Sequence, residues 1–79
     1  MRIVRELTQG EVRISVFHWN NKFLLKFERG RLEMTFKVPE YDIAGEEWLI
    51  RLATGELLQK CIGHFDRLEA DWNQALESE

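Results

Sequence analysis

The first half of the chain alternates apolar and polar residues with period two, which is typical of strands that bury one face. Four such stretches cover residues 2–8, 11–19, 22–28 and 31–38. They are separated by the pairs Gln9-Gly10, Asn20-Asn21 and Arg29-Gly30, and Gly and Asn tolerate the positive φ of tight hairpin turns. The pattern therefore predicts a four-stranded antiparallel meander.

Two-residue loops at these three pairs would also fix the strand register. Val16 then lies opposite Leu25, and Leu25 lies opposite Met34, so that apolar side chains share one face. The other face carries neighbours of opposite charge: Glu6 beside Arg13, Arg13 beside Glu28, Glu28 beside Arg31, and Lys26 beside Glu33. The first hairpin fits less well, because it places Arg5 beside Ile14 on the apolar face, and a bulge or an edge position could turn Arg5 outward.

The second half of the chain has helical spacing. Pro39 ends the sheet because it has no N–H to donate. Trp48, Leu49 and Leu52 form a short apolar face, and Thr54 is a candidate N-cap for a second helix over residues 55–77. The apolar stripe of that helix comprises Leu57, Leu58, Cys61, Ile62, Phe65, Leu68, Trp72 and Leu76. We expect an α+β fold in one domain, residues 1–79, with a short helix and then a long amphipathic helix packed on one sheet face.

Whether the two helices are separate or continuous stays open from the pattern alone. Gly63 lies inside the long helix, where Gly costs about 1 kcal/mol relative to Ala. Its presence suggests either a bend or a close contact at that turn.

The long helix is longer than the sheet beneath it. Residues 55–77 make a rod of about 34 Å, whereas four strands span less than about 20 Å across. Trp72 and Leu76 should then extend beyond the sheet without an intramolecular partner, and a second copy of the chain is the simplest cover. The alternative is a diagonal or bent helix that folds both residues onto its own sheet.

Composition and charge restrict the cellular compartment and the kinds of partner that we expect. The chain of 79 residues has one cysteine, which excludes an internal disulfide and favours a reducing compartment. No apolar run is long enough to span a bilayer, and charges interrupt the N-terminal residues, so we expect a soluble, cytoplasmic protein without membrane contact. The net charge of −3 divides into +4 over residues 1–38 and −7 over residues 39–79. Such a division marks a nucleic-acid face or two surfaces that attract each other.

Catalytic and metal-binding patterns are weak. Cys61 and His64 are three residues apart on a helix and could present two metal ligands, but the pattern supplies no further ligand, and Cys61 lies on the apolar stripe. The glycines are isolated, which does not predict a phosphate loop. We therefore expect no catalytic residue, no metal and no cofactor. An enzyme would need a pocket near His18, His64 and Tyr41. His18, at the end of the apolar face, is either a pH switch or a hydrogen-bonded boundary residue.

The outward face of the predicted sheet carries a mixed apolar and basic patch. It collects Val4, Phe17, Trp19 and Leu24, bordered by Arg2, Lys22 and Lys37. Aromatic residues among cations suit single-stranded nucleic acid, for which the candidate residues are Arg2, Phe17, Trp19, Lys22 and Lys37. We favour protein contacts instead, because the chain is acidic overall and few of its cations lack an opposing carboxylate.

The sequence thus predicts a small non-catalytic interaction or regulatory module. We expect a homodimer, with another protein as a possible second partner and nucleic acid as the alternative. The candidate interface residues are Val4, Phe17, Trp19 and Leu24 on the sheet, and Trp72 and Leu76 on the long helix.

Overall fold

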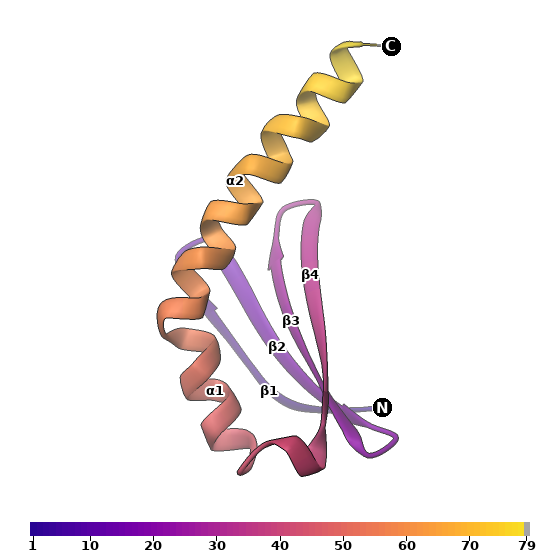
Figure 1. Ribbon diagram of the computed structural model, residues 1–79, viewed down its shortest axis with the longest axis vertical. Helices are drawn as coiled ribbons and strands as arrows, with labels where there is room; N and C mark the ends of the chain where they lie inside the picture. Colours follow the sequence, from indigo (N-terminus) through magenta and orange to yellow (C-terminus); the bar gives the residue numbers. More distant parts are fainter. Residues whose placement is uncertain (79) are drawn as a thin grey trace.

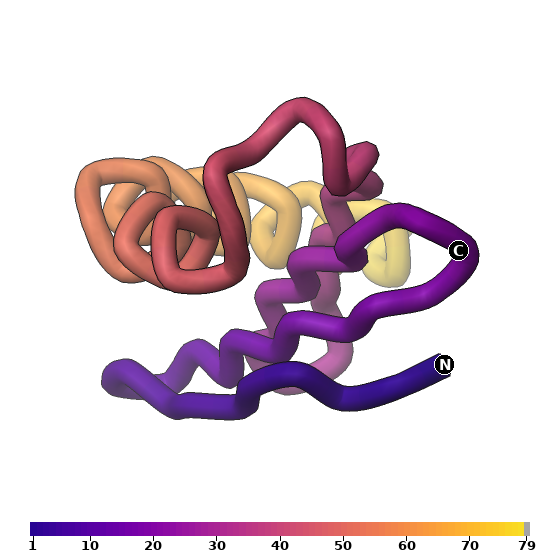
Figure 2. The backbone as a smooth tube through the Cα atoms, turned by 90° about the horizontal axis from the view of Figure 1, so that it is seen from below, coloured from indigo at the N-terminus to yellow at the C-terminus, as the bar shows by residue number. Residues whose placement is uncertain are grey.

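The computed structural model describes residues 1–78 as one two-layer α+β unit. The strands are β1 (Arg2–Gln9), β2 (Val12–Trp19), β3 (Lys22–Arg29) and β4 (Leu32–Pro39), and they form an antiparallel sheet in the order β1-β2-β3-β4. A 3-10 turn η1 (Glu40–Asp42) leads to helices α1 (Glu46–Thr54) and α2 (Glu56–Glu77). Both helices lie on the same side of the twisted sheet (Figures 1 and 2). The predicted α+β fold is confirmed, while Glu79, the last residue of the predicted domain, lies outside the described residues.

The hairpin turns are all two residues long, and they use two kinds of turn. Asn20 (φ 54°) and Asn21 (φ 62°) both have positive φ, as a type I′ turn requires. In the other two hairpins only the first loop residue has positive φ, namely Gly10 and Gly30, both at 61°. A glycine in that position is typical of a type II′ turn. The predicted loops at residues 9–10 and 29–30 are therefore wrong by one residue, because glycine opens each turn and does not close it.

The register follows from these turns. Between β2 and β3 it is as predicted, with Val16 opposite Leu25 and His18 opposite Phe23. In the β3–β4 hairpin the partners are displaced by two residues, so Leu25 lies opposite Phe36 and not opposite Met34. A displacement of two residues leaves every side chain on its predicted face, since strands have a side-chain period of two. The division between the core face and the outer face consequently survives the error.

Strand β1 contains an irregularity between Ile3 and Arg5. Arg5 lies opposite Val16 and not Ile14, and its Nη1 donates to Oε1 of Glu47 on α1 at 3.4 Å. The expectation that a bulge turns Arg5 to the outer face is therefore wrong. Arg5 lies on the helix-facing side of the sheet, where it contacts the carboxylate of Glu47 on α1. Val4, within the irregularity, packs against the core.

The core lies between the sheet and both helices. Its buried residues are Val12, Ile14, Val16, Leu25 and Phe27 from the sheet, Leu49, Ile50 and Ala53 from α1, and Leu58, Cys61 and Phe65 from α2. On α1 the predicted apolar face is partly wrong, because Trp48 and Leu52 are exposed. Ile50 and Ala53 point into the core instead. Viewed along the helix axis, they lie on one side of Leu49, and Trp48 and Leu52 lie on the opposite side.

The two helices are separate and meet at Gly55. The Thr54 hydroxyl donates back to the carbonyl oxygen of Ile50 at 3.0 Å, so the predicted N-cap role of Thr54 is wrong. A Cβ at Gly55 would lie 3.3 Å from the carbonyl oxygen of Arg51, which explains a glycine at this join. At Gly63, in contrast, α2 continues without interruption and a Cβ would meet no atom within 4 Å. Of the two alternatives at Gly63, a bend or a close contact, the close contact is therefore absent.

We expect Gly63→Ala to stabilise the protein by about 1 kcal/mol, because alanine loses less backbone entropy in a helix and the added methyl group meets open space. Urea unfolding followed by circular dichroism measures this change. The matched control is Gly30→Ala, which should destabilise by about 1–2 kcal/mol because alanine resists positive φ. A loss of stability in Gly63→Ala would contradict the open surroundings of this residue.

Candidate functional site

The second half of α2 extends beyond the sheet. Figure 1 shows the helix passing the β3–β4 turn and continuing to the C-terminal end of the chain. The molecule measures 44 × 24 × 19 Å, and its radius of gyration is 14.1 Å. A compact domain of this length has a radius of gyration of about 11.6 Å. We call residues 66–77 the α2 tail, and the elongated shape of the molecule reflects this tail.

The apolar stripe of α2 continues along the tail after its core contacts end. Phe65 is fully buried, whereas Leu68, Trp72 and Leu76 are 45%, 44% and 50% exposed. We call these three residues the tail strip. The alternative in which the helix bends back to bury Trp72 and Leu76 is not observed. The expectation that Trp72 lacks any intramolecular partner is wrong in one respect, because the Arg31 guanidinium lies 6.0 Å from the centre of its ring.

Arg29 connects the end of β3 to the first turn of the tail. Its two guanidinium nitrogens donate to Asp66 at 2.8 Å and to Glu69 at 3.1 Å, and the group lies 5.4 Å from the centre of the Phe65 ring. The hydrogen bond to Asp66 raises the pKa of Arg29 above its already high value. This contact was not predicted from the sequence, because the pattern placed Arg29 in a turn. The available signal was that Arg29 continues the period-two spacing of Leu25 and Phe27, the core face of β3.

The outer face of the sheet carries an apolar row across β1, β2 and β3 that ends at a lysine on β4. The register aligns Ile3, Phe17, Leu24 and Lys37, and the next row contains Trp19, Lys22 and Pro39. Two predicted members lie elsewhere, since Val4 packs against the core and Arg2 is opposite His18 on the helix-facing side. Ile3, which the sequence analysis did not select, takes the place expected for Val4. We call Ile3, Phe17, Trp19, Leu24, Lys22 and Lys37 the outer patch.

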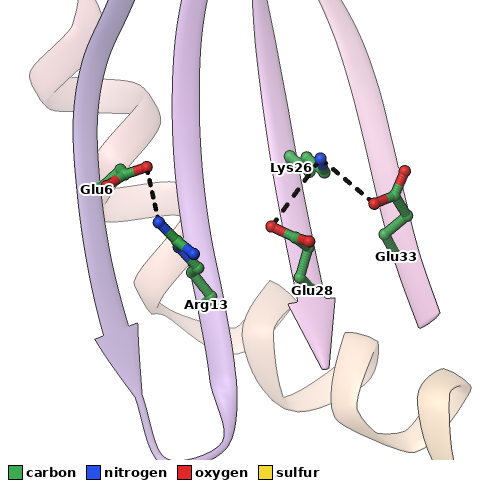
Figure 3. Close-up of polar contacts among 5 residues, drawn as sticks. All are labelled: Glu6, Arg13, Lys26, Glu28 and Glu33. Atoms are coloured by element: carbon green, nitrogen blue, oxygen red, sulfur yellow. Dashed lines mark hydrogen bonds and ion pairs between the residues drawn. The ribbon is translucent and has the colours of Figure 1, made fainter. Parts of the chain in front are cut away.

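Much of the rest of the outer face is charged, and Glu6, Arg13, Lys26, Glu28 and Glu33 form ion pairs on it (Figure 3). Arg13 donates to Glu6 at 3.1 Å, and the Lys26 ammonium lies 3.3 Å from Glu33 and 3.9 Å from Glu28. Lys22 lies 5.3 Å from the centre of the Trp19 ring, so it covers part of that indole. Basic charge on this face is thus largely neutralised by carboxylates or already engaged with an aromatic ring.

The candidate chemical residues lie on three different elements, with His18 near the end of β2, Tyr41 in η1 and His64 on α2. Nε2 of His18 lies 2.8 Å from Oε2 of Glu40, so this residue is hydrogen-bonded at the margin of the sheet. His64 is exposed on α2, and Tyr41 is exposed in η1. Among the 78 described residues no three His, Cys, Asp or Glu side chains form a group that could hold a metal ion. In the same part of the chain, neither helix combines the length and apolar character needed to cross a membrane.

Cys61 is buried on the core side of α2, as its place on the apolar stripe predicts. Burial raises the pKa of this thiol above its ordinary value of 9.0, because the thiolate would lose its hydration. A thiol held in its neutral form is a poor nucleophile and a poor metal ligand. The structure therefore gives Cys61 a packing role.

This pKa shift predicts a specific pH dependence of stability. In the unfolded chain the thiol ionises near its ordinary pKa, while in the folded protein it stays protonated to higher pH. The unfolded state then binds fewer protons, so stability should fall above about pH 9 by at most about 1.4 kcal/mol per pH unit. Urea unfolding between about pH 7.5 and about pH 10 measures the effect, and Cys61→Ala, which lacks the thiol, should lose less stability over this range. Parallel curves for the two proteins would contradict the prediction.

Comparison with known proteins adds no relative from which a function could be transferred. The chain matches no family model, no curated protein sequence and no solved structure. Its function is therefore argued from its own contacts, burial and charges.

Proposed function

We propose that this chain is a non-catalytic protein-interaction module that self-associates as a homodimer through the tail strip. The observation that carries the proposal is a helix face that is buried at Phe65 and then continues through Leu68, Trp72 and Leu76, which are 45%, 44% and 50% exposed, as α2 runs past the end of the sheet. Contiguous exposed apolar surface bordered by polar residues is typical of association sites.

The total exposed surface supports this proposal. The chain exposes 5617 Å², whereas a compact monomer of 9.5 kDa exposes about 5,000 Å². The excess of roughly 600 Å² is close to the area that each partner buries in a small protein interface. Burial of one α2 tail against another chain would remove surface of this size.

The composition and the rigidity of the tail also suit an interface. Tryptophan is among the residues that contribute most to binding energy in protein interfaces. The first turn of the tail already contacts Arg29 through two carboxylates, so this turn would lose little conformational freedom on association. A partner would therefore meet a preformed apolar helix face.

The alternative, binding of single-stranded nucleic acid by the outer patch, has less support. Trp19 is 48% exposed and could stack on a base. However, Arg13 and Lys26 are paired with carboxylates, and Lys22 lies over Trp19. Few cations are left for phosphate groups, and the electrostatic part of binding scales with the number of phosphates neutralised.

Sedimentation equilibrium over a concentration series tests the proposal. We expect a reversible increase from one to two chain masses. Trp72→Ala should raise the dissociation constant roughly thirtyfold, because truncating a central interface tryptophan costs about 2 kcal/mol.

Trp48→Ala is the matched control, since Trp48 is also an exposed indole but lies on α1 outside the tail strip. It should leave the dissociation constant unchanged. A chain that remains monomeric at the highest soluble concentration would exclude self-association, and equal effects of both substitutions would exclude the tail strip as its site.

A further inference from the structure

We infer that two copies pair through antiparallel α2 tails about a two-fold axis at Trp72, so that each tail covers the strip of the other. This inference rests on the proposed self-association and specifies its contact. The occupant of the tail strip is thus the tail strip of a second copy, and the two sheets lie at opposite ends of the assembly.

The spacing of the strip matches this symmetry. Leu68 and Leu76 lie four residues before and four residues after Trp72. In an antiparallel pair centred on Trp72, each Leu68 faces Leu76 of the second copy and the two indoles meet at the axis. A two-fold interface requires this kind of self-complementary pattern. All three exposed apolar residues of the tail are then covered together.

Charge favours the antiparallel direction over the parallel one. With the axis at Trp72, Glu69 faces Ala75 of the second copy and Asp71 faces Asn73, so no carboxylate directly opposes another. A parallel pair would place each of these carboxylates beside its own counterpart, which disfavours association. The helix dipoles also attract each other in the antiparallel pair, because each positive end lies beside a negative end, and they repel each other in the parallel pair.

The space available around the tail also favours the antiparallel arrangement. In a parallel pair both sheets would lie at the same end, where α2 is already packed on its own core through Leu58, Cys61 and Phe65. In the antiparallel pair the second tail approaches from the free end and runs toward the β3–β4 turn. An open hollow lies there, with Glu11, Arg31 and Leu32 among its lining residues.

Arg31 is the basic group that the approaching tail would meet. Its guanidinium lies beside Trp72 and makes no ion pair with any carboxylate of residues 1–78. The last turn of α2 contains no basic residue. A helix C-terminus carries partial negative charge and is stabilised by a nearby cation. Arg31 of one copy can supply that cation to the acidic tail of the other.

Disulfide trapping tests the direction of the pair. Leu68→Cys and Leu76→Cys are made separately in a Cys61→Ala background and oxidised mildly, alone and as an equal mixture. In the antiparallel pair positions 68 of the two copies are about 12 Å apart along the axis, beyond the roughly 7 Å limit between disulfide-bonded Cα atoms. Positions 68 and 76 of different copies face each other. We expect at least about tenfold more covalent dimer in the mixture than in either variant alone.

Three results would overturn the inference. Efficient cross-linking of Leu68→Cys alone indicates a parallel pair, and a dimeric mass without cross-linking in any sample indicates another surface, such as the outer patch. Both leave self-association itself intact. A parent chain that is monomeric at all concentrations overturns the proposed function as well.

A charge reversal tests the role of Arg31. Arg31→Glu should weaken dimerisation by about threefold or more, because it places a carboxylate beside the acidic tail of the second copy. Arg51→Glu, a reversal at an exposed arginine of α1, should leave the affinity unchanged and controls for net charge. Equal affinities of the two variants would remove Arg31 from the contact.

Discussion

A mismatch of length between α2 and the sheet determines the rest of this structure. Eight-residue strands and a nine-residue α1 leave room on the inner face for only the first half of a 22-residue helix. The apolar stripe, however, continues to Leu76 along the whole helix. Hydrophobic surface removed from water contributes about 25 cal/mol per Å². The uncovered half of the stripe therefore leaves apolar surface whose burial would stabilise an association.

The junction between core and tail is an aromatic residue covered by an arginine. Phe65 closes the core, and Arg29 lies over it while its guanidinium binds Asp66 and Glu69 on the next turn of α2. This arrangement satisfies the charge with two carboxylates and couples the end of β3 to the beginning of the tail.

The sequence predictions were more accurate where more residues supported the same pattern. The β2–β3 register was correct because Asn20 and Asn21 admit positive φ together and both strands alternate clearly. The other hairpins were displaced because one glycine can open or close a two-residue turn. The buried face of α1 was predicted wrongly because nine residues make only a few helical turns, which is too few to show which face is apolar. In addition, Trp48 and Leu52 are as apolar as Ile50 and Ala53, which lie in the core in their place.

By itself, the sequence determined the fold class, the faces of β2, β3 and β4, and the apolar stripe of α2, because periodicities of two and of about 3.6 decide which side chains share a face. It also indicated that the helix outruns the sheet, since lengths follow from residue counts. Only the tertiary structure decided the pairing of Arg29 with the tail, the inward turn of Val4 and the exposed fraction of each strip residue. Those features depend on where separate elements meet in space, and residues far apart in the chain carry no local signal of that meeting.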